Sequence, residues 1–235
     1  AVMILLAGPA GALAWREGGP MIGLIILALA ALTAFGFSTE INIVALFAAI
    51  IAASIAYMRP RGFLSALFGL VAGTFIVVPL TLPGLIGALP DSLLDSLPTS
   101  WVMRLEIWEY TSDQLGERLW AGWGLDASRV LGGPAEIRGV SFDLLPLHPH
   151  NAALNVWLET GGFGAMLLAF ALVMIGGRVA GAPRLSRLQA ASIAWVVTVH
   201  TVLIMGSYGV WQDWLLASVA IAIGGCSFLG ARGRN

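Results

Sequence analysis

The 235 residues are 58% hydrophobic and only 11% charged, which leaves too few polar side chains to cover a soluble domain of this length. The apolar stretches are long and do not alternate with period two, so we expect an all-α polytopic membrane protein rather than a β-barrel. A formal net charge of −1 gives no indication of a nucleic-acid partner. All 12 basic residues are arginines, which excludes Schiff-base chemistry on lysine.

Apolar runs predict about seven transmembrane helices. They lie at about 1–15, 20–38, 41–58, 63–89, 152–176, 188–207 and 212–230. The first run is shorter than the roughly 20 residues that a span needs. We therefore expect residues 1–235 to be a single membrane domain that forms the C-terminal portion of a longer protein. Cys226 lies in the last run and is expected to be a small packed side chain.

Arginines gather at alternate turns between these runs, which predicts that those turns are cytoplasmic. The arginines concerned are Arg16, Arg59, Arg61, Arg178, Arg184, Arg187, Arg232 and Arg234. The opposite side then receives Glu40, the stretch 90–150 and the short turn at 208–213. We therefore expect residues 90–150 to form a long extracytoplasmic loop.

This loop holds nine acidic residues against four arginines. A structureless loop of about 60 residues is uncommon between compact helices unless it has a function. Within it, Ser100 can cap a helix over 101–120. Residues at helical spacing predict one apolar face, consisting of Trp101, Leu105, Trp108, Leu115 and Leu119. The tryptophans favour a position in the membrane interface, with a purely scaffolding helix as the alternative. We expect irregular structure from about 122 to His150.

Polar side chains are concentrated where the loop enters the fifth apolar run. His148 and His150 precede Asn151, which can cap that helix. Asn151, Asn155 and Glu159 recur every four residues and therefore form a stripe on one helical face. Gly161, Gly162 and Gly164 follow, and we expect them to thin the helix so that a neighbour can pack closely.

Histidine is the side chain best suited to exchange a proton near neutral pH, so we interpret His148 and His150 as candidate functional residues. A metal site is the competing interpretation. It would have only Glu159 as a further ligand, and that residue lies about 12 Å along the helix. We therefore predict no metal. His200 lies near the middle of the sixth apolar run, where a hydrogen bond between helices is expected.

Arg104, one turn before Trp108, is a candidate phosphate ligand, because a guanidinium beside an aromatic ring can bind phosphate bidentately. An ion pair with Glu106 or Glu109 is the alternative. Arg118 and Arg129 are weaker candidates for the same role, and Arg138 is weaker still.

Three motifs in this order resemble the O-antigen ligase and polymerase superfamily of bacterial membrane glycosyltransferases. Arg104 and Trp108 match its Arg-x3-Trp, and Gly122 and Gly124 match its Gly-x-Gly. The third motif combines His-Asn-x2-Leu with Glu-x-Gly-x2-Gly, matched by His150, Asn151, Leu154, Glu159, Gly161 and Gly164. The resemblance covers about residues 40–175.

The resemblance implies a part in the assembly of surface polysaccharide in the bacterial cell envelope. Such enzymes take a glycan from a polyprenyl-diphosphate carrier in the inner membrane and, on the periplasmic side, pass it to lipid A core or to another glycan. They need no cofactor or metal. The resemblance implies that His150 is the base or orients the acceptor hydroxyl, and that Arg104 binds the diphosphate. The substrate site would include His148, Trp108, Arg118, Arg129, Asn151, Asn155 and Glu159.

Two departures accompany the resemblance. Family members commonly have a Ser-Arg pair where this chain has Ser38, Thr39 and Glu40, and they have about twelve helices. Two other functions therefore stay open. One is a transporter or flippase of lipid-linked sugars, which would place ionisable groups such as His200 at mid-membrane. The other is a non-catalytic subunit of an assembly complex.

Overall fold

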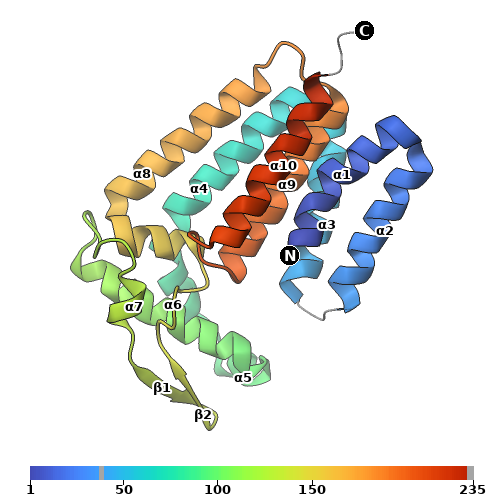
Figure 1. Cartoon of the computed structure of the whole chain (residues 1–235). Coiled ribbons are helices and arrows are strands. Elements are labelled where there is room, and N and C mark those ends of the chain that lie inside the picture. Colours follow the sequence, from blue (N-terminus) through green and yellow to red (C-terminus); the bar gives the residue numbers. More distant parts are fainter. Residues whose placement is uncertain (37–39, 232–235) are drawn as a thin grey trace. The chain divides into compact units, whose positions relative to one another are not determined.

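The computed structural model describes residues 1–36 and 40–231, which form helices and one β-hairpin (Figure 1). Ser38, Thr39, Arg232 and Arg234 lie outside the described residues. The helices are α1 Val2–Gly18, α2 Pro20–Gly36, α3 Glu40–Met58, α4 Pro60–Gly87, α5 Asp91–Ser96, α6 Thr99–Glu117, α7 Ser128–Leu131, α8 Ala152–Ala180, α9 Arg187–Gly206 and α10 Asp213–Ala231. The hairpin consists of β1 Pro134–Ile137 and β2 Val140–Asp143.

The expected all-α polytopic membrane fold is confirmed. Within the described residues, α3, α4, α8, α9 and α10 are long and apolar enough to cross a membrane. The 17-residue helix α2 is apolar but shorter. The chain groups into two compact units. Unit 1 contains Ala1–Leu70, Leu172–Leu203 and the segment from Trp211, and unit 2 contains Val71–Ala171 and Ile204–Val210.

Unit 1 is a group of apolar helices in which α1 packs against α2 and α10. The indole of Trp195 on α9 donates a hydrogen bond to the carbonyl of Ile4 on α1, at 2.8 Å. The Arg16 guanidinium, at the end of α1, donates to the carbonyls of Phe228 and Leu229 near the end of α10. Terminal carbonyls of a helix lack partners within the helix, so this arginine stabilises the end of α10.

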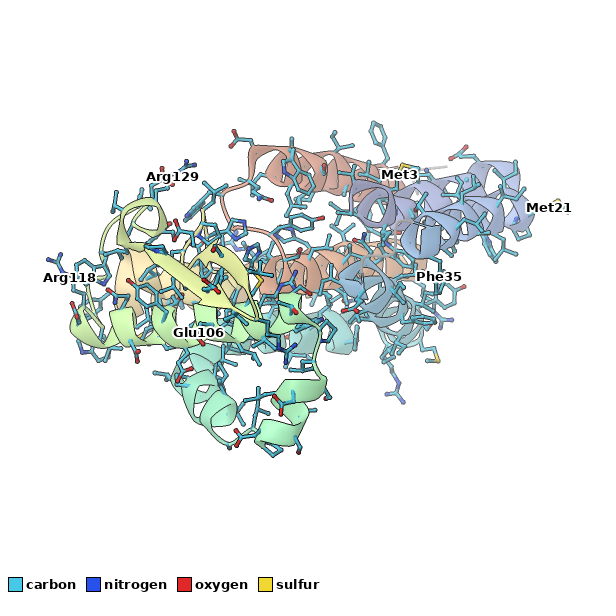
Figure 2. The ribbon with its side chains drawn as sticks, turned by 90° about the horizontal axis from the view of Figure 1, so that it is seen from below. Met3, Met21, Phe35, Glu106, Arg118 and Arg129 are labelled. Atoms are coloured by element: carbon cyan, nitrogen blue, oxygen red, sulfur yellow. The ribbon has the colours of Figure 1, made fainter. Side chains whose placement is uncertain are left out.

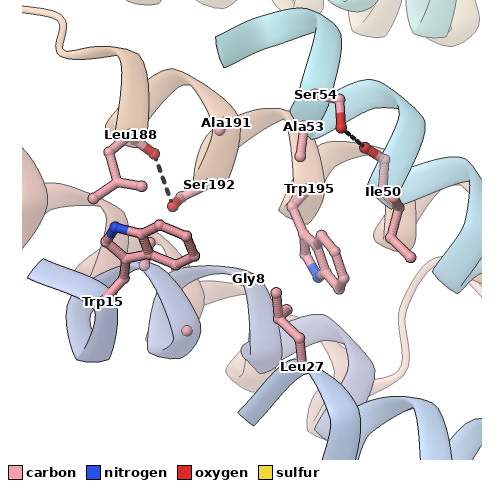
Figure 3. Close-up of a pocket in the computed structure, with 12 residues that line it drawn as sticks. Gly8, Trp15, Leu27, Ile50, Ala53, Ser54, Leu188, Ala191, Ser192 and Trp195 are labelled. Carbon is pink, nitrogen blue, oxygen red and sulfur yellow. Dashed lines mark hydrogen bonds between the residues drawn. The ribbon is translucent and has the colours of Figure 1, made fainter. Parts of the chain in front are cut away.

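A small crevice of about 190 Å³ lies in unit 1 among α1, α2, α3 and α9 (Figure 3). Its two hydroxyl groups, those of Ser54 and Ser192, donate to carbonyls of their own helices at 2.7 and 3.0 Å. Because these hydroxyls are already satisfied, the crevice presents an apolar surface formed largely by tryptophan, leucine and alanine side chains. It offers no acid, base or cation for chemistry.

Unit 2 contains the predicted loop helix as α6, although Ser100 does not cap it. The residue before the helix is Pro98, whose fixed φ suits an entry to a helix, and no side chain caps this end. Of the predicted apolar face, only Leu115 is buried. Ile107, Thr111 and Leu115 are buried, because this side of α6 faces the rest of the unit, whereas Trp101 is only half-buried.

The segment expected to be irregular contains the short helix α7 and the hairpin. Pro134 pairs with Asp143 and Ile137 with Val140, and Arg138 and Gly139 form the turn with positive φ. Such a two-residue turn suits the twist of an antiparallel pair. Arg138 also donates hydrogen bonds to carbonyls at the end of α5, which holds the tip of the hairpin there.

Helix α8 begins as predicted, with the Asn151 side chain accepting hydrogen bonds from the amides of Ala153 and Leu154. The helix predicted over the apolar run 152–176 forms, but Gly161 interrupts it with φ 64° and ψ −172°. Figure 1 shows the short first part of α8 running across the direction of the part that follows.

A loop segment covers this break. The amides of Trp123 and Gly124 donate to the carbonyls of Leu158 and Glu159, at 2.7 and 3.0 Å, and the Gly162 amide donates to the carbonyl of Leu119 at 2.8 Å. A Cβ atom at Gly161 would overlap the Trp120 carbonyl, and one at Gly122 would overlap the backbone of Glu159. The predicted close approach is therefore made by this loop.

Candidate active site

A cavity of about 320 Å³ lies in unit 2 between α6 and the chain that leads from β2 into α8. One wall is α6, which contributes Arg104 and its neighbours. The other wall contains Asp143, at the end of β2, and His150. We call this the Arg104–His150 cavity, and its lining consists of Ser100, Met103, Arg104, Ile107, Phe142, Asp143, Pro146 and His150.

The backbone carbonyl of Ser207 fixes the imidazole of His150. Its oxygen lies 2.7 Å from Nδ1 of His150. A carbonyl can only accept, so Nδ1 carries the proton and, in the neutral ring, Nε2 keeps its lone pair. His150 also has φ 54°, a left-handed backbone conformation that few residues other than glycine adopt. The histidine is thus held in the tautomer that a general base requires.

The charge state of His150 also suits a base. Burial lowers its pKa below the usual 6.5, and the positive charge of Arg104 lowers it further, whereas the bond to Ser207 acts in the opposite direction. The net shift is downward. At neutral pH the ring is therefore mainly uncharged and can accept a proton.

His148 supports His150 rather than lining the cavity. Its Nδ1 accepts a hydrogen bond from the backbone amide of His150 at 3.2 Å, and the two rings lie edge to face with centroids 4.5 Å apart. Burial, followed by the neighbouring His150, lowers the pKa of His148 to about 4. His148 is thus a neutral acceptor near neutral pH that holds the backbone of His150.

Trp108 connects the two walls of the cavity. Its indole N–H donates to the carbonyl of Pro149, the residue before His150, at 2.9 Å. Arg104 lies one turn earlier on the same helix, so a single hydrogen bond sets α6 and its arginine beside the histidine. The spacing of four residues thus lets Arg104 line the cavity while Trp108 binds the backbone of the opposite wall.

The Arg104 guanidinium is not consumed by an ion pair. No acidic oxygen of the described residues lies within 4.0 Å of it, so the alternative pairing with Glu106 or Glu109 does not form there. One terminal nitrogen donates to the carbonyl of Ser100 at 3.2 Å, and the group lies over the Trp101 ring. Its Nε is buried without a hydrogen-bond partner. Arg104 can therefore still bind an anion.

The polar stripe on α8 forms as predicted, but it is buried. Asn155 and Glu159 are 2% and 3% exposed, and the Asn155 amide donates to the Glu159 carboxylate at 2.9 Å. Asn151 is 6% exposed and caps the helix. None of the three lines the cavity. The side chains of Asn151 and Asn155 form hydrogen bonds within the first part of α8, and the backbone carbonyl of Glu159 accepts from the Gly124 amide of the covering loop.

Arg118 and Arg129 lie outside the cavity, and Figure 2 shows them near one edge of unit 2. Arg118 lies over the ring of Trp123, 4.4 Å from its centroid, and Arg129 pairs with Asp126 at 2.9 Å. Both side chains are exposed. Glu106, also labelled in Figure 2, is an exposed residue of α6.

Sequence reasoning missed two groups of this site. Asp143 was one of nine acids in the loop, and only the hairpin brings it to the cavity. The Ser207 carbonyl is a backbone group distant in sequence from His150, and no side-chain motif could indicate it. The bond between helices predicted for His200 is not formed by its Nδ1, which is buried without a partner among the described residues.

Several known proteins are similar in sequence to part of this chain. A relative from Rickettsia conorii, named as a candidate polysaccharide ligase, is 26% identical over 167 residues, which cover 69% of this chain and 40% of that protein. A similarly named relative from Rickettsia bellii is 30% identical over 65% of this chain and 38% of its own length. A third relative with a similar name, from Rickettsia prowazekii, is 33% identical over 49% of this chain and 29% of its own length. No solved structure matches.

This chain spans about two fifths of the length of the relatives from Rickettsia conorii and Rickettsia bellii. Residues 24–169 match the family described as O-antigen ligase. The matched range is more than half of the chain and includes both walls of the Arg104–His150 cavity. The chain therefore belongs to the O-antigen ligase family.

Proposed function

We propose that this multi-pass membrane protein transfers a glycan from a polyprenyl-diphosphate carrier to lipid A core. The observation that carries the proposal is the Arg104–His150 cavity, where a cation without an ionic partner and a neutral imidazole line the same space. The names of the family and of the relatives favour a ligase over a polymerase that extends another glycan.

The proposed reaction is a displacement at the anomeric carbon of the donor sugar. The acceptor hydroxyl oxygen forms a bond to that carbon, and the bond from the carbon to the diphosphate oxygen breaks. Nε2 of His150 takes the hydroxyl proton, and the polyprenyl diphosphate leaves with the electron pair. Arg104 stabilises the charge that develops on the diphosphate. The guanidinium supplies the positive charge, so the scheme requires no metal or cofactor.

Other predicted residues act around these two. Trp108 and His148 position His150, through the Pro149 carbonyl and the His150 amide. Asn151, Asn155 and Glu159 stabilise the first part of α8, which follows the histidine directly. Arg118 and Arg129 are exposed and are proposed to contact more distant parts of the glycan or membrane headgroups.

We place the protein in the bacterial inner membrane with the cavity on the periplasmic side. The arginines at alternate turns support this orientation. The reaction also favours a cavity at the membrane boundary, because the carrier's hydrocarbon tail stays in the bilayer while its sugars are in water.

A replacement of His150 tests the proposal. In cells that lack the native gene, His150→Ala protein should insert normally but attach no glycan to lipid A core, and the lipid-linked donor should accumulate in the periplasmic leaflet. His200→Ala is the control, because this histidine lies outside the cavity. Full glycan attachment by His150→Ala would refute the proposed role. Donor that accumulates in the cytoplasmic leaflet would instead indicate a flippase.

A further inference from the structure

We infer that the carboxylate of Asp143 binds hydroxyl groups of the glycan acceptor in the Arg104–His150 cavity. The inference rests on the proposed function and adds to it a residue that sets the affinity for the acceptor. Asp143 and Arg104 lie on opposite walls of the cavity, on β2 and α6 respectively.

The backbone holds Asp143 firmly in this place. It is the last residue of β2 and pairs with Pro134. Just beyond it, the Leu144 amide donates to the carbonyl of Gly133, at 2.9 Å, and the side chain of Leu145 is buried. Oδ1 of Asp143 accepts a hydrogen bond from the amide of Leu145 at 3.0 Å. One carboxylate oxygen thus fixes the turn, and Oδ2 remains available for another donor.

The charges in the cavity determine what Asp143 can bind. Asp143 and Arg104 line the same space, yet no ion pair within 4.0 Å joins them. A carboxylate repels a diphosphate, so the anionic part of the donor belongs on the Arg104 side. The groups left for the Asp143 side are neutral hydrogen-bond donors. An ionised carboxylate only accepts hydrogen bonds, and sugar hydroxyls supply such donors in abundance.

His150 belongs to the wall that also contains Asp143, and this shared wall indicates which sugar Asp143 binds. The attacking hydroxyl must lie near Nε2 of His150, while other hydroxyls of the same sugar lie a few ångströms away. An acceptor held by Asp143 would therefore present one hydroxyl to the base, with the diphosphate on the opposite side. This arrangement separates the two substrates by charge, because Arg104 selects the anion and Asp143 selects the uncharged polyol.

The variant Asp143→Asn separates this role from a purely structural one. Asparagine retains the oxygen that accepts from Leu145 but removes the negative charge. Charge-assisted hydrogen bonds are roughly twice as strong as neutral ones, so we expect the KM for the acceptor to rise about fivefold to tenfold. The KM for the donor should stay within about twofold. The matched control is Glu136→Gln, an exposed acid of the same hairpin outside the cavity.

Steady-state kinetics of the membrane-embedded protein, with polyprenyl-diphosphate glycan and lipid A core as substrates, measure both constants. Unchanged acceptor KM in Asp143→Asn, combined with instability of Asp143→Ala, would overturn the inference in favour of a turn residue only. A changed donor KM with a constant acceptor KM would also overturn it. The proposed function is tested by a different variant, and it is rejected if His150→Ala retains glycan transfer. An inactive His150→Ala beside an unaltered Asp143→Asn would reject only the role of Asp143.

Discussion

At the scale of single residues, the site depends on which hydrogen bonds are already made. His150 uses Nδ1 for the Ser207 carbonyl and leaves Nε2 available, whereas Arg104 keeps a buried Nε without a partner. His150 is therefore oriented to accept a proton, and Arg104 can bind an anion. Buried polar atoms without partners are uncommon in folded proteins, and at a cavity wall they suggest a ligand.

The pH dependence of transfer should follow His150. Protonation removes the base, so kcat/KM should fall as the pH drops through the pKa of His150, which lies below 6.5. Arg104→Gln removes a positive charge and should raise this pKa, moving the acid limb of the profile to higher pH. Arg104→Lys keeps the charge and should leave the limb in place while weakening donor binding. An acid limb that Arg104→Gln leaves unmoved would contradict the electrostatic coupling.

Trp108→Phe tests the connection between the two walls. The change removes the indole N–H that donates to the Pro149 carbonyl but keeps an aromatic ring. A single such bond contributes about 1 kcal/mol, so transfer should fall roughly fivefold. Trp120→Phe is the matched control, because Trp120 is 54% exposed. Equal activities of the two variants, measured as initial rates of transfer, would argue against this role of Trp108.

Local patterns in the sequence predicted residues that act within a few positions of one another. The Asn151 cap and the stripe of Asn155 and Glu159 depend only on helical spacing, and both form. Asp143 could not be singled out, because its place depends on strand pairing with Pro134. The Ser100 cap was wrong because the helix already begins at Thr99, with Pro98 at the capping position.

At the scale of elements, the break in α8 joins two of the sequence motifs. Gly122 and Gly124 belong to the loop that covers the break, and Gly161 forms the break itself. The apolar run from 152 to 176 indicated one helix, because hydropathy does not report a single residue with positive φ. Backbone amides and carbonyls freed by the break need partners in an apolar environment, and the loop supplies them.

Gly161→Ala should therefore destabilise the protein. Alanine disfavours φ near +64°, and its Cβ would overlap the Trp120 carbonyl, so we expect a loss of at least about 1–3 kcal/mol. Gly177→Ala, in the helical part of α8 with open space around the added Cβ, should be neutral or slightly stabilising. Thermal unfolding in detergent measures both. Equal melting temperatures for the two variants would show that the break is not required.

At the scale of the whole molecule, composition indicated the membrane class. The order of apolar residues indicated where the spans lie, because a span is a property of about 20 consecutive residues. Neither property of the sequence could indicate the two compact units, because these arise from contacts between segments that are distant in the chain. The orientation of the loop rests on the arginine distribution and is open to direct measurement.

Cysteine labelling tests the orientation. In a background with Cys226→Ala, Asp113→Cys on the exposed side of α6 should react with a membrane-impermeant maleimide added to the periplasm. Arg184→Cys, in the exposed turn between α8 and α9, should react only after the inner membrane is disrupted. The reverse pattern of labelling would place the cavity on the cytoplasmic side and contradict the proposed reaction.

The most direct test of the central claim is a single-turnover transfer with the purified native protein, polyprenyl-diphosphate glycan and lipid A core. A positioned general base contributes on the order of 10²–10⁴ in rate, so His150→Ala should slow the transfer step by that factor while donor binding persists. A transfer rate for His150→Ala within about threefold of the native rate would contradict the assignment of His150 as the base.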